Sequence, residues 1–272
     1  MMDRMAQPTQ ESVLYARSLL ADLPEAIRDA AREPYGARAV IYCLLLDKGA
    51  ELRDEQLALL QSRADKDVYA LTIDLMPQMD ALEKRFRLPI IDIAIPALKQ
   101  LSGSQYPSFK KNLLALIDMD TRVDLFEWSL QKILFRHLEG HFEKPSSTIT
   151  RHADPGQLTR EFALVLSVMA HTGATDQGSA QGAFDASAQS LAANSLTLLA
   201  MDQISSADLD QALGTLDRLA PADKSRLLTA CVISTWHDQR ATPTEVELLR
   251  AFASVLDCPM PPGMTPGGRH DD

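Results

Sequence analysis

Four carboxylates lie within ten residues of one another in the first half of the sequence, at Asp118, Asp120, Asp124 and Glu127. Carboxylate oxygens gathered around a turn are the ligands that calcium and magnesium prefer in proteins. The spacing of Asp120 and Glu127 recurs at Asp238 and Glu245, 118 residues further along the chain. These six residues therefore indicate a weakly bound divalent cation, and no other cofactor is expected.

Helix capping is the simpler interpretation of the same residues. Asp124 with Glu127, and Thr242 with Glu245, each match a capping box, in which an N-cap side chain and the third helical residue satisfy each other's backbone donors. Pro243 stands where a helix accepts proline, at its first position. An EF-hand would need a glycine at the sharp turn, which is absent from both copies. The cation site remains the alternative, which calcium titration would test.

The stretch His137-Leu138-Glu139-Gly140-His141 superficially resembles a zinc-protease motif. In H-E-x-x-H the glutamate directly follows the first histidine. Here it comes two residues later, about 200° around a helix, on the wrong face. We also expect Gly140 to end the helix. We therefore predict no catalytic residue and no enzyme, and a hydrolase built from His137, His141 and distant carboxylates is kept only as an alternative.

The remaining chemistry of the sequence is sparse. It contains no P-loop, no G-x-S-x-G, no G-x-G-x-x-G after a strand and no C-x-x-C pair. With 37 acidic and 27 basic residues, a net charge of −10 and a pI near 5.1, the chain is a poor partner for nucleic acid. Its longest apolar run, 39–46, is far short of the ~20 residues of a membrane span. Three cysteines without metal spacing and no apparent signal peptide favour the cytoplasm.

The elements that must position these residues are helices, because apolar residues recur three and four apart almost everywhere. An all-α fold is therefore predicted. We expect helices at about 10–23, 25–33, 36–47, 54–63, 67–85, 89–101, 106–118, 125–138, 158–170, 191–202, 206–219, 222–235 and 243–256. The small, polar residues of 172–190 predict a mobile loop.

Breaks in this pattern divide the chain. We expect an N-terminal helical block over 1–142, a hinge over 143–157, a second block over 158–258 and a disordered tail over 259–272. At an offset of 118, nine identities link 91–138 with 209–256, which indicates an internal repeat. The predicted architecture is antiparallel helix pairs followed by two similar bundle units.

Several segments resemble the region that follows the catalytic domain in bacterial membrane zinc metallopeptidases of the HtpX and CAAX prenyl protease class. The resemblance is carried by LPEAI (23–27), EPYGARAVIYCLLLD (33–47), LPIID (88–92), ALKQLS (97–102), QY (105–106) and LFEWSLQ (125–131), and more faintly by EVELLRA (245–251) and CPMPP (258–262). The H-E-x-x-H motif and the membrane helices of that class have no counterpart in this sequence. No catalytic residue is therefore carried over.

The two helix-loop-helix copies also resemble the tellurite-resistance TerB fold, a small helical bundle with an acidic face. The TerB pattern has a glycine after the loop aspartate, where this chain has Thr121 and Gln239. The resemblances imply two TerB-like units in a cytoplasmic extension without its peptidase domain. They imply a non-catalytic interaction or regulatory module whose partner is a protein, namely a membrane zinc metallopeptidase at the cytoplasmic face of the inner membrane. The alternatives are a TerB-like sensor of divalent cations and part of a metallopeptidase whose catalytic domain lies elsewhere.

Overall fold

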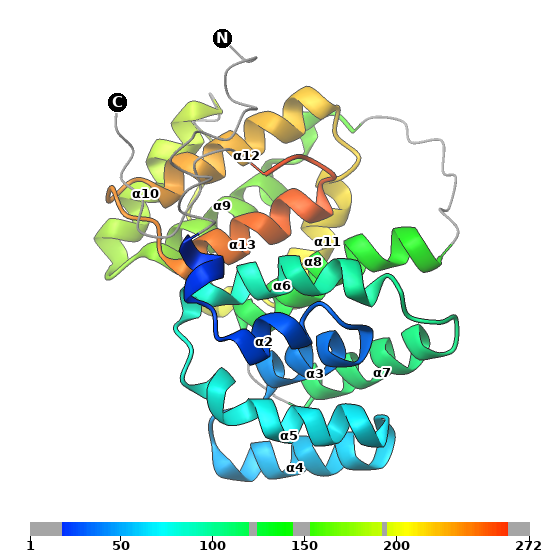
Figure 1. The fold of residues 1–272 in the computed structure, drawn as a ribbon. Coiled ribbons are helices and arrows are strands. Elements are labelled where there is room, and N and C mark those ends of the chain that lie inside the picture. The colour runs from blue at the N-terminus through cyan, green and yellow to red at the C-terminus, as the bar shows by residue number, and fades with distance from the viewer. Residues whose placement is uncertain (1–17, 120–123, 144–152, 192–194, 261–272) are drawn as a thin grey trace. The chain divides into compact units, whose positions relative to one another are not determined.

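The computed structural model describes residues 18–119, 124–143, 153–191 and 195–260. Within these ranges every regular element is a helix and no strand occurs, so the predicted all-α class is confirmed (Figure 1). The α-helices are α2 (Glu25–Ala30), α3 (Pro34–Leu45), α4 (Ala50–Arg63), α5 (Lys66–Asp80), α6 (Arg87–Leu98), α7 (Gln105–Ile117), α8 (Leu125–Phe142), α9 (Thr159–Gly173), α10 (Gln177–Ser190), α11 (Ser206–Leu216), α12 (Pro221–Thr235) and α13 (Pro243–Val255). Short 3-10 turns are η2 (Lys84–Phe86), η3 (Pro155–Gln157) and η4 (Met201–Gln203).

The helices form two compact units. The N-terminal unit contains α2 to α7 and the two ends of α8, and the C-terminal unit contains residues 128–133 of α8 together with α9 to α13. No helix among the described residues is long and apolar enough to span a bilayer. The predicted hinge at 143–157 lies partly, and the tail at 259–272 mostly, outside the described residues.

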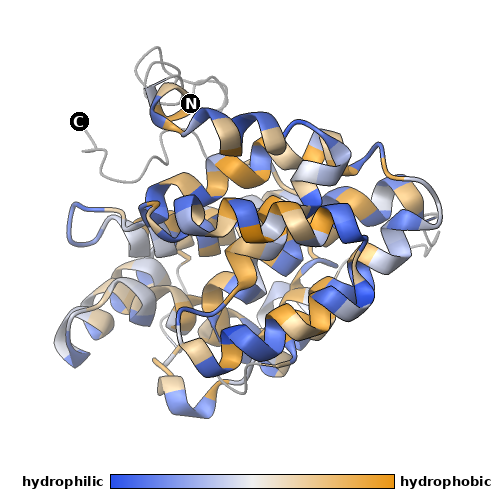
Figure 2. Cartoon of the chain, turned by 60° about the horizontal axis from the view of Figure 1, so that its bottom comes forward, coloured by the Kyte–Doolittle hydropathy of each residue, from blue (hydrophilic) through white to orange (hydrophobic). Residues whose placement is uncertain are grey.

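The N-terminal unit is built around α3, which packs against α2, α5, α6 and α7. Residues 36–43 of this helix are all buried, as expected for a helix that is apolar on every side. The outer helices instead carry bands of hydrophobic and hydrophilic residues (Figure 2). Gly36 allows α3 to approach the end of α2, because a Cβ atom there would lie 2.1 Å from the carbonyl oxygen of Ala30.

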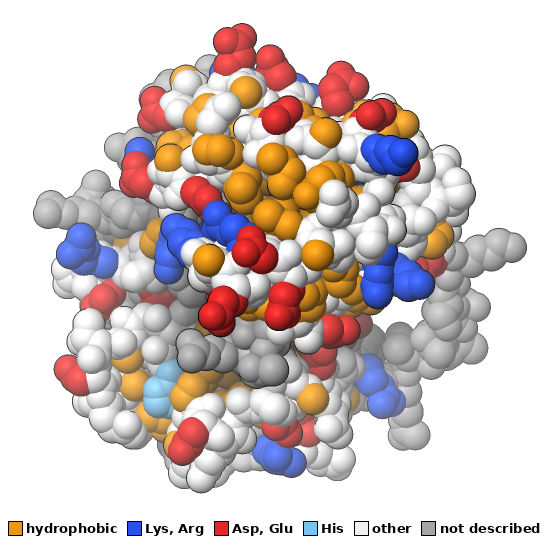
Figure 3. Space-filling view, turned by 90° about the horizontal axis from the view of Figure 1, so that it is seen from below, with side chains coloured by type: hydrophobic (Ala, Val, Ile, Leu, Met, Phe, Trp, Pro, Cys, Tyr) orange, Lys and Arg blue, Asp and Glu red, His pale blue; other side chains and the backbone are white. Residues whose placement is uncertain are grey.

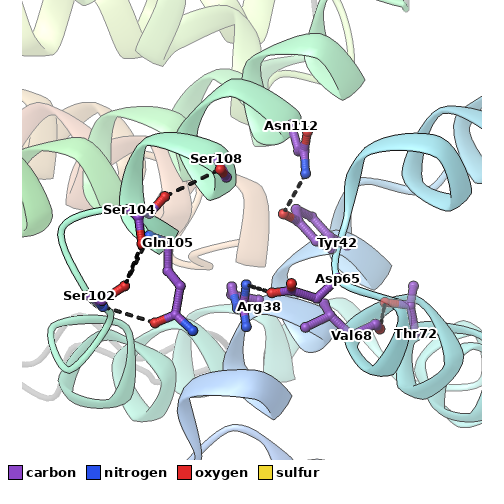
Figure 4. A network of polar contacts seen from close by, with 10 residues as sticks. All are labelled: Arg38, Tyr42, Asp65, Val68, Thr72, Ser102, Ser104, Gln105, Ser108 and Asn112. Atoms are coloured by element: carbon purple, nitrogen blue, oxygen red, sulfur yellow. Dashed lines mark hydrogen bonds and ion pairs between the residues drawn. The ribbon is translucent and has the colours of Figure 1, made fainter.

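One charge lies inside this central helix. Arg38 is 3% exposed, and its Nη1 forms an ion pair of 2.5 Å with Asp65 at the N-cap of α5 (Figure 4). Its guanidinium also stacks on the exposed ring of Tyr35 at 4.8 Å. One turn further along α3, the hydroxyl of Tyr42 accepts a hydrogen bond of 3.3 Å from Asn112 of α7. These polar contacts fix the register of α3 against α5 and α7.

The C-terminal unit repeats the plan around α9, which packs against α10, α11, α12 and α13. Residues 162–170 of α9 are all buried. Trp128 joins this core from α8, since its ring meets Phe252 edge-on at 6.0 Å and its indole N–H donates to Asp210 over 2.8 Å. The ammonium group of Lys132 lies 2.7 Å from the same carboxylate.

Two predicted elements around 172–202 are wrong. The expected loop is helix α10, because Asp176 and Ser179 form a capping box and the alanines favour helix. Ala183 and Phe184 are buried on this helix, which packs against α9 and α12. The helix expected at 191–202 is not formed over 195–200, where His171 and Ser167 of α9 instead bond to the backbone of Leu199.

Helix α8 also departs from its prediction. It continues through Gly140 to Phe142, so this glycine does not end the helix. Of the first predicted helix, 10–23, only 18–23 lies in the described residues, and 18–22 is helical. The other predicted helices are present with ends shifted by a few residues.

Candidate functional site

The two predicted loops lead into helices that begin at equivalent points. The N-caps of α8 and α13, Asp124 and Thr242, are 118 residues apart, which is the predicted offset. Asp124 Oδ1 accepts from the backbone N–H of Phe126 at 2.6 Å, and a full capping box joins Thr242 with Glu245. A side-chain N-cap is therefore present at both places, but the reciprocal bond of a capping box is shown only for Thr242 with Glu245.

The predicted cation residues fall into two groups. Asp124 and Glu127 line a cavity in the N-terminal unit, and Asp238 and Glu245 line another in the C-terminal unit. Asp118 is an exposed residue at the C-cap of α7 and lines neither cavity. Asp120 lies outside the described residues.

The first cavity, which we name the Asp124 cavity, has a volume of about 350 Å³. It lies where α3 and α5 end and where η2, α6 and α8 begin. Its apolar residues are Leu44, Leu45, Leu46, Met79, Leu82, Phe86, Ile90 and Phe126. Its charged residues are Asp47, Lys48, Asp80, Glu83, Lys84, Arg87, Asp124 and Glu127. The cavity therefore combines apolar side chains with charges of both signs.

Internal contacts order the rim of the Asp124 cavity. Arg53 holds Asp80 through two hydrogen bonds of 2.6 and 2.9 Å, and Arg85 lies 3.0 Å from Glu83. The guanidinium of Arg87 lies 3.9 Å from the ring centre of Phe126. These contacts order the carboxylates of Asp80 and Glu83 and the ring of Phe126.

The one thiol in this cavity is not activated. Burial raises the pKa of Cys43 to about 12, and Asp80 adds to this effect. The thiol donates to the carbonyl of Thr72 over 3.3 Å. Since the thiolate is the nucleophile, Cys43 is inert at neutral pH.

The second cavity, which we name the Glu245 cavity, has a volume of about 70 Å³. It lies where α9 and α12 end and where α10 and α13 begin. Its lining residues are Ala170, Gly173, Ala174, Thr175, Ser179, Ala183, Ser234, His237, Asp238 and Glu245. It thus contains two carboxylates, one imidazole and no lysine or arginine.

Glu245 is the unusual member of this set, because it is an acidic residue that is only 3% exposed. Its Oε2 accepts hydrogen bonds of 2.8 Å from both the backbone N–H and the hydroxyl of Thr242. Burial raises the pKa of Glu245, the bonds from Thr242 oppose this rise, and the nearby charge of Asp238 adds to it. No hydrogen bond to Oε1 is made by any residue that the structure describes.

Glycines make room for the polar atoms around this cavity. A Cβ atom on Gly173 would lie 2.1 Å from Oε1 of Glu245, and one on Gly182 would lie 2.7 Å from Nε2 of His237. Gly182 lies inside α10, where glycine costs about 1 kcal/mol relative to alanine. The space needed by the imidazole of His237 therefore explains why glycine stands at position 182, although it weakens helix α10.

The described residues hold no group of three His, Cys, Asp or Glu side chains able to bind a metal together. His137 and His141 both lie on α8, and the ring of His141 packs edge-on against Phe142 at 4.8 Å. The cation site around Asp120 stays a prediction, because that residue lies outside the described ranges.

Two other surface features lie outside these two cavities. A cavity of about 310 Å³ lies beside η3 and the start of α12, where Phe162, Leu191 and Leu196 meet the ion pair of Asp223 with Arg226. Apolar side chains also gather on the face seen from the side of α4 and α5, with acidic and basic side chains around them (Figure 3). Neither feature brings together groups that would perform chemistry.

The chain was compared with family models, with curated proteins and with solved structures, and nothing matched.

Sequence reasoning located four of the cavity carboxylates but missed their neighbours. His237 and Ser234 belong to α12 and its end, which the repeat does not single out. The available signal is the position of Gly182 within a run of small residues, which predicts a loop but forms helix α10.

Proposed function

We propose that this chain is a non-catalytic helical module that acts by binding a partner protein, and that the Asp124 cavity receives an apolar side chain of that partner. The observation that carries the proposal is the cavity itself, which is lined by leucine, methionine and phenylalanine side chains together with charged side chains of both signs. Such a centre with a polar rim is the usual anatomy of a protein interface. The protonated thiol of Cys43 offers no nucleophile there.

The partner that we propose is a membrane zinc metallopeptidase. This choice is supported by the resemblance of 23–47, 88–106 and 125–131 to the helical extension of such enzymes. The left-handed backbone of Gln239, with a φ of 64°, supports the TerB-like resemblance, because the TerB pattern has glycine at that position. The peptidase would bring the module to the cytoplasmic face of the membrane.

A substitution at Leu82 tests the proposal. This residue is half-buried, lines the cavity and lies in the turn between α5 and η2, outside any helix. Leu82→Arg should abolish capture of the peptidase from solubilised membranes. The matched control, Ala58→Arg on the exposed side of α4, should leave capture unchanged. Equal capture by both variants would contradict docking at this cavity.

A divalent-cation sensor is the second candidate function. It is favoured by the presence of Asp238 and Glu245 in one cavity. A sensor predicts a rise in melting temperature with calcium or magnesium that is lost in Asp238→Asn. No rise at millimolar cation would contradict it.

A further inference from the structure

The Glu245 cavity presents hydrogen-bond acceptors without a positive charge to meet them. Glu245 is only 3% exposed, yet no lysine or arginine is among the residues that line the cavity. Its Oε1 lies over Gly173, a lining residue, and accepts no hydrogen bond within the described ranges. Buried carboxylates are normally paired with a cation. Oε1 is therefore an acceptor that remains open to a donor entering the cavity.

The end of α9 strengthens the negative character of the cavity. Its C-cap residue, Ala174, is extended, with φ −76° and ψ 140°. No backbone N–H from beyond the helix bonds to the last carbonyls of α9 in the part of the chain that is described. Unpaired carbonyl groups form the negative end of a helix dipole. Ala170, Gly173 and Ala174, from this end, line the cavity.

A third observation comes from α12. Ser234 lines the cavity, is 4% exposed, and its hydroxyl has no partner among the described residues. A serine hydroxyl both donates and accepts, and it moves between staggered positions by rotation about one bond. Ser234 therefore adds an acceptor that becomes satisfied when a donor enters.

These acceptors suit an ammonium group better than a metal ion. Calcium takes six to eight oxygen ligands, whereas the described residues provide no set of three metal-binding side chains. An ammonium group needs only about three acceptors. The volume of about 70 Å³ exceeds the ~10–15 Å³ that one water requires, and so admits an ammonium with its adjoining methylene.

We propose that the Glu245 cavity binds a primary ammonium group, supplied by a lysine side chain of the partner protein. Glu245 Oε1 accepts one N–H, the carbonyl groups at the end of α9 accept another, and Asp238 adds negative charge at the mouth. Only the source of the ammonium rests on the proposed function. The site itself does not depend on docking at the Asp124 cavity.

Titration of the full chain with methylammonium chloride, followed by the amide resonances of Gly173 and His237, tests the site. The resonances should shift and saturate. Tetramethylammonium chloride and sodium chloride at equal ionic strength should leave them in place, because neither offers an N–H donor. Equal shifts with all three salts, or none with methylammonium, would overturn the proposal. Saturation by calcium at lower concentration than methylammonium would also overturn it, in favour of a metal site.

Glu245→Gln is the informative variant, because glutamine also serves in a capping box. It should fold with an unchanged spectrum elsewhere and bind methylammonium about tenfold more weakly or worse. Asp185→Asn, an exposed carboxylate on α10 that does not line the cavity, should bind as the parent does. Unchanged binding by Glu245→Gln would exclude Glu245 as the acceptor.

A capped lysine, Nα-acetyl-lysine amide, identifies the source. It should shift the same resonances as methylammonium. If methylammonium binds and the capped lysine does not, a lysine side chain is excluded as the ligand. Failure of methylammonium binding would leave the Leu82→Arg result unaffected, so the two proposals are tested separately.

Discussion

The carboxylate of Glu245 fills the space directly above Gly173, so that a Cβ atom on Gly173 would lie 2.1 Å from Oε1. The same carboxylate completes the capping box of α13 through Thr242. One side chain, that of Glu245, thereby contacts both the end of α9 and the start of α13. Any residue larger than glycine at 173 must displace that side chain.

Three glycine substitutions should therefore differ in their effect on stability. Gly173→Ala should lower the free energy of unfolding by about 1–3 kcal/mol, because it overpacks the site and disturbs a cap. Gly36→Ala should cost more, since its Cβ would meet the backbone oxygen of Ala30, which cannot rotate away. Gly214→Ala on α11, with open space around it, should raise stability by about 0.5–1 kcal/mol. Urea unfolding of the three variants would measure this order, and a Gly173→Ala as stable as Gly214→Ala would contradict the described geometry.

Two substitutions of Glu245 should distinguish the contribution of its capping bonds to stability from the contribution of its carboxylate. Glu245→Gln keeps the capping bonds and removes a carboxylate that burial disfavours, so stability at neutral pH should stay equal or rise. Glu245→Ala loses the cap and should cost about 1 kcal/mol. Thermal unfolding of both variants provides the measurement. A large loss of stability in the glutamine variant would show that the charge itself has a partner within the fold.

Replacing Gln239 with glycine should stabilise the fold. Its φ of 64° is left-handed, a conformation that costs a residue with a Cβ atom about 1 kcal/mol. Gln239→Gly should raise the free energy of unfolding by roughly 0.5–1 kcal/mol, despite the greater entropy of glycine in the unfolded chain. Chemical denaturation would detect this gain, and a loss of stability would place Gln239 in another conformation.

Stability should fall at alkaline pH. Burial raises the pKa of Cys43, Cys231 and Tyr42 to about 12, so the folded chain holds these protons more tightly than the unfolded chain. The stabilisation is complete below the ordinary thiol pKa of 9.0 and is lost as pH rises from there towards 12. At pH 10.5 the raised pKa of each thiol should lower the free energy of unfolding by about 2 kcal/mol relative to neutral pH.

Urea unfolding between pH 8 and pH 11 would measure this slope. Cys231→Ala should flatten it, because one buried titrating group is removed. A parental slope in that variant would show that Cys231 does not titrate in this range.

Much of this fold can be predicted from the sequence, because helices produce a strong periodic spacing of apolar residues. The buried helices α3 and α9 are apolar on every side, and the caps at Asp124 and Thr242 combine a side-chain acceptor with a favourable third residue or a proline. Helix α10 was missed because its apolar face consists mainly of alanines with a single Phe184. Small residues on a close-packed face look like a loop when only large apolar residues are counted.

Less of the candidate site can be predicted from the sequence, because sequence spacing does not show which helices meet in space. Spacing along the sequence identifies which residues begin the same helix, and so Glu245 and Asp238 were found together. It does not show that Gly173, from α9, and Ser234, from α12, meet them in space. Those contacts depend on how α9, α10, α12 and α13 pack, which local sequence does not specify.

Photo-crosslinking from position 82 shows which protein occupies the Asp124 cavity. The full chain, carrying a photoreactive phenylalanine analogue at Leu82, is irradiated with solubilised membranes and the products are identified by mass spectrometry. We expect a crosslink to a membrane zinc metallopeptidase from position 82 and none from the same analogue at position 58. Crosslinks of equal yield from both positions, or none from Leu82, would contradict the claim that this module binds its partner through the Asp124 cavity.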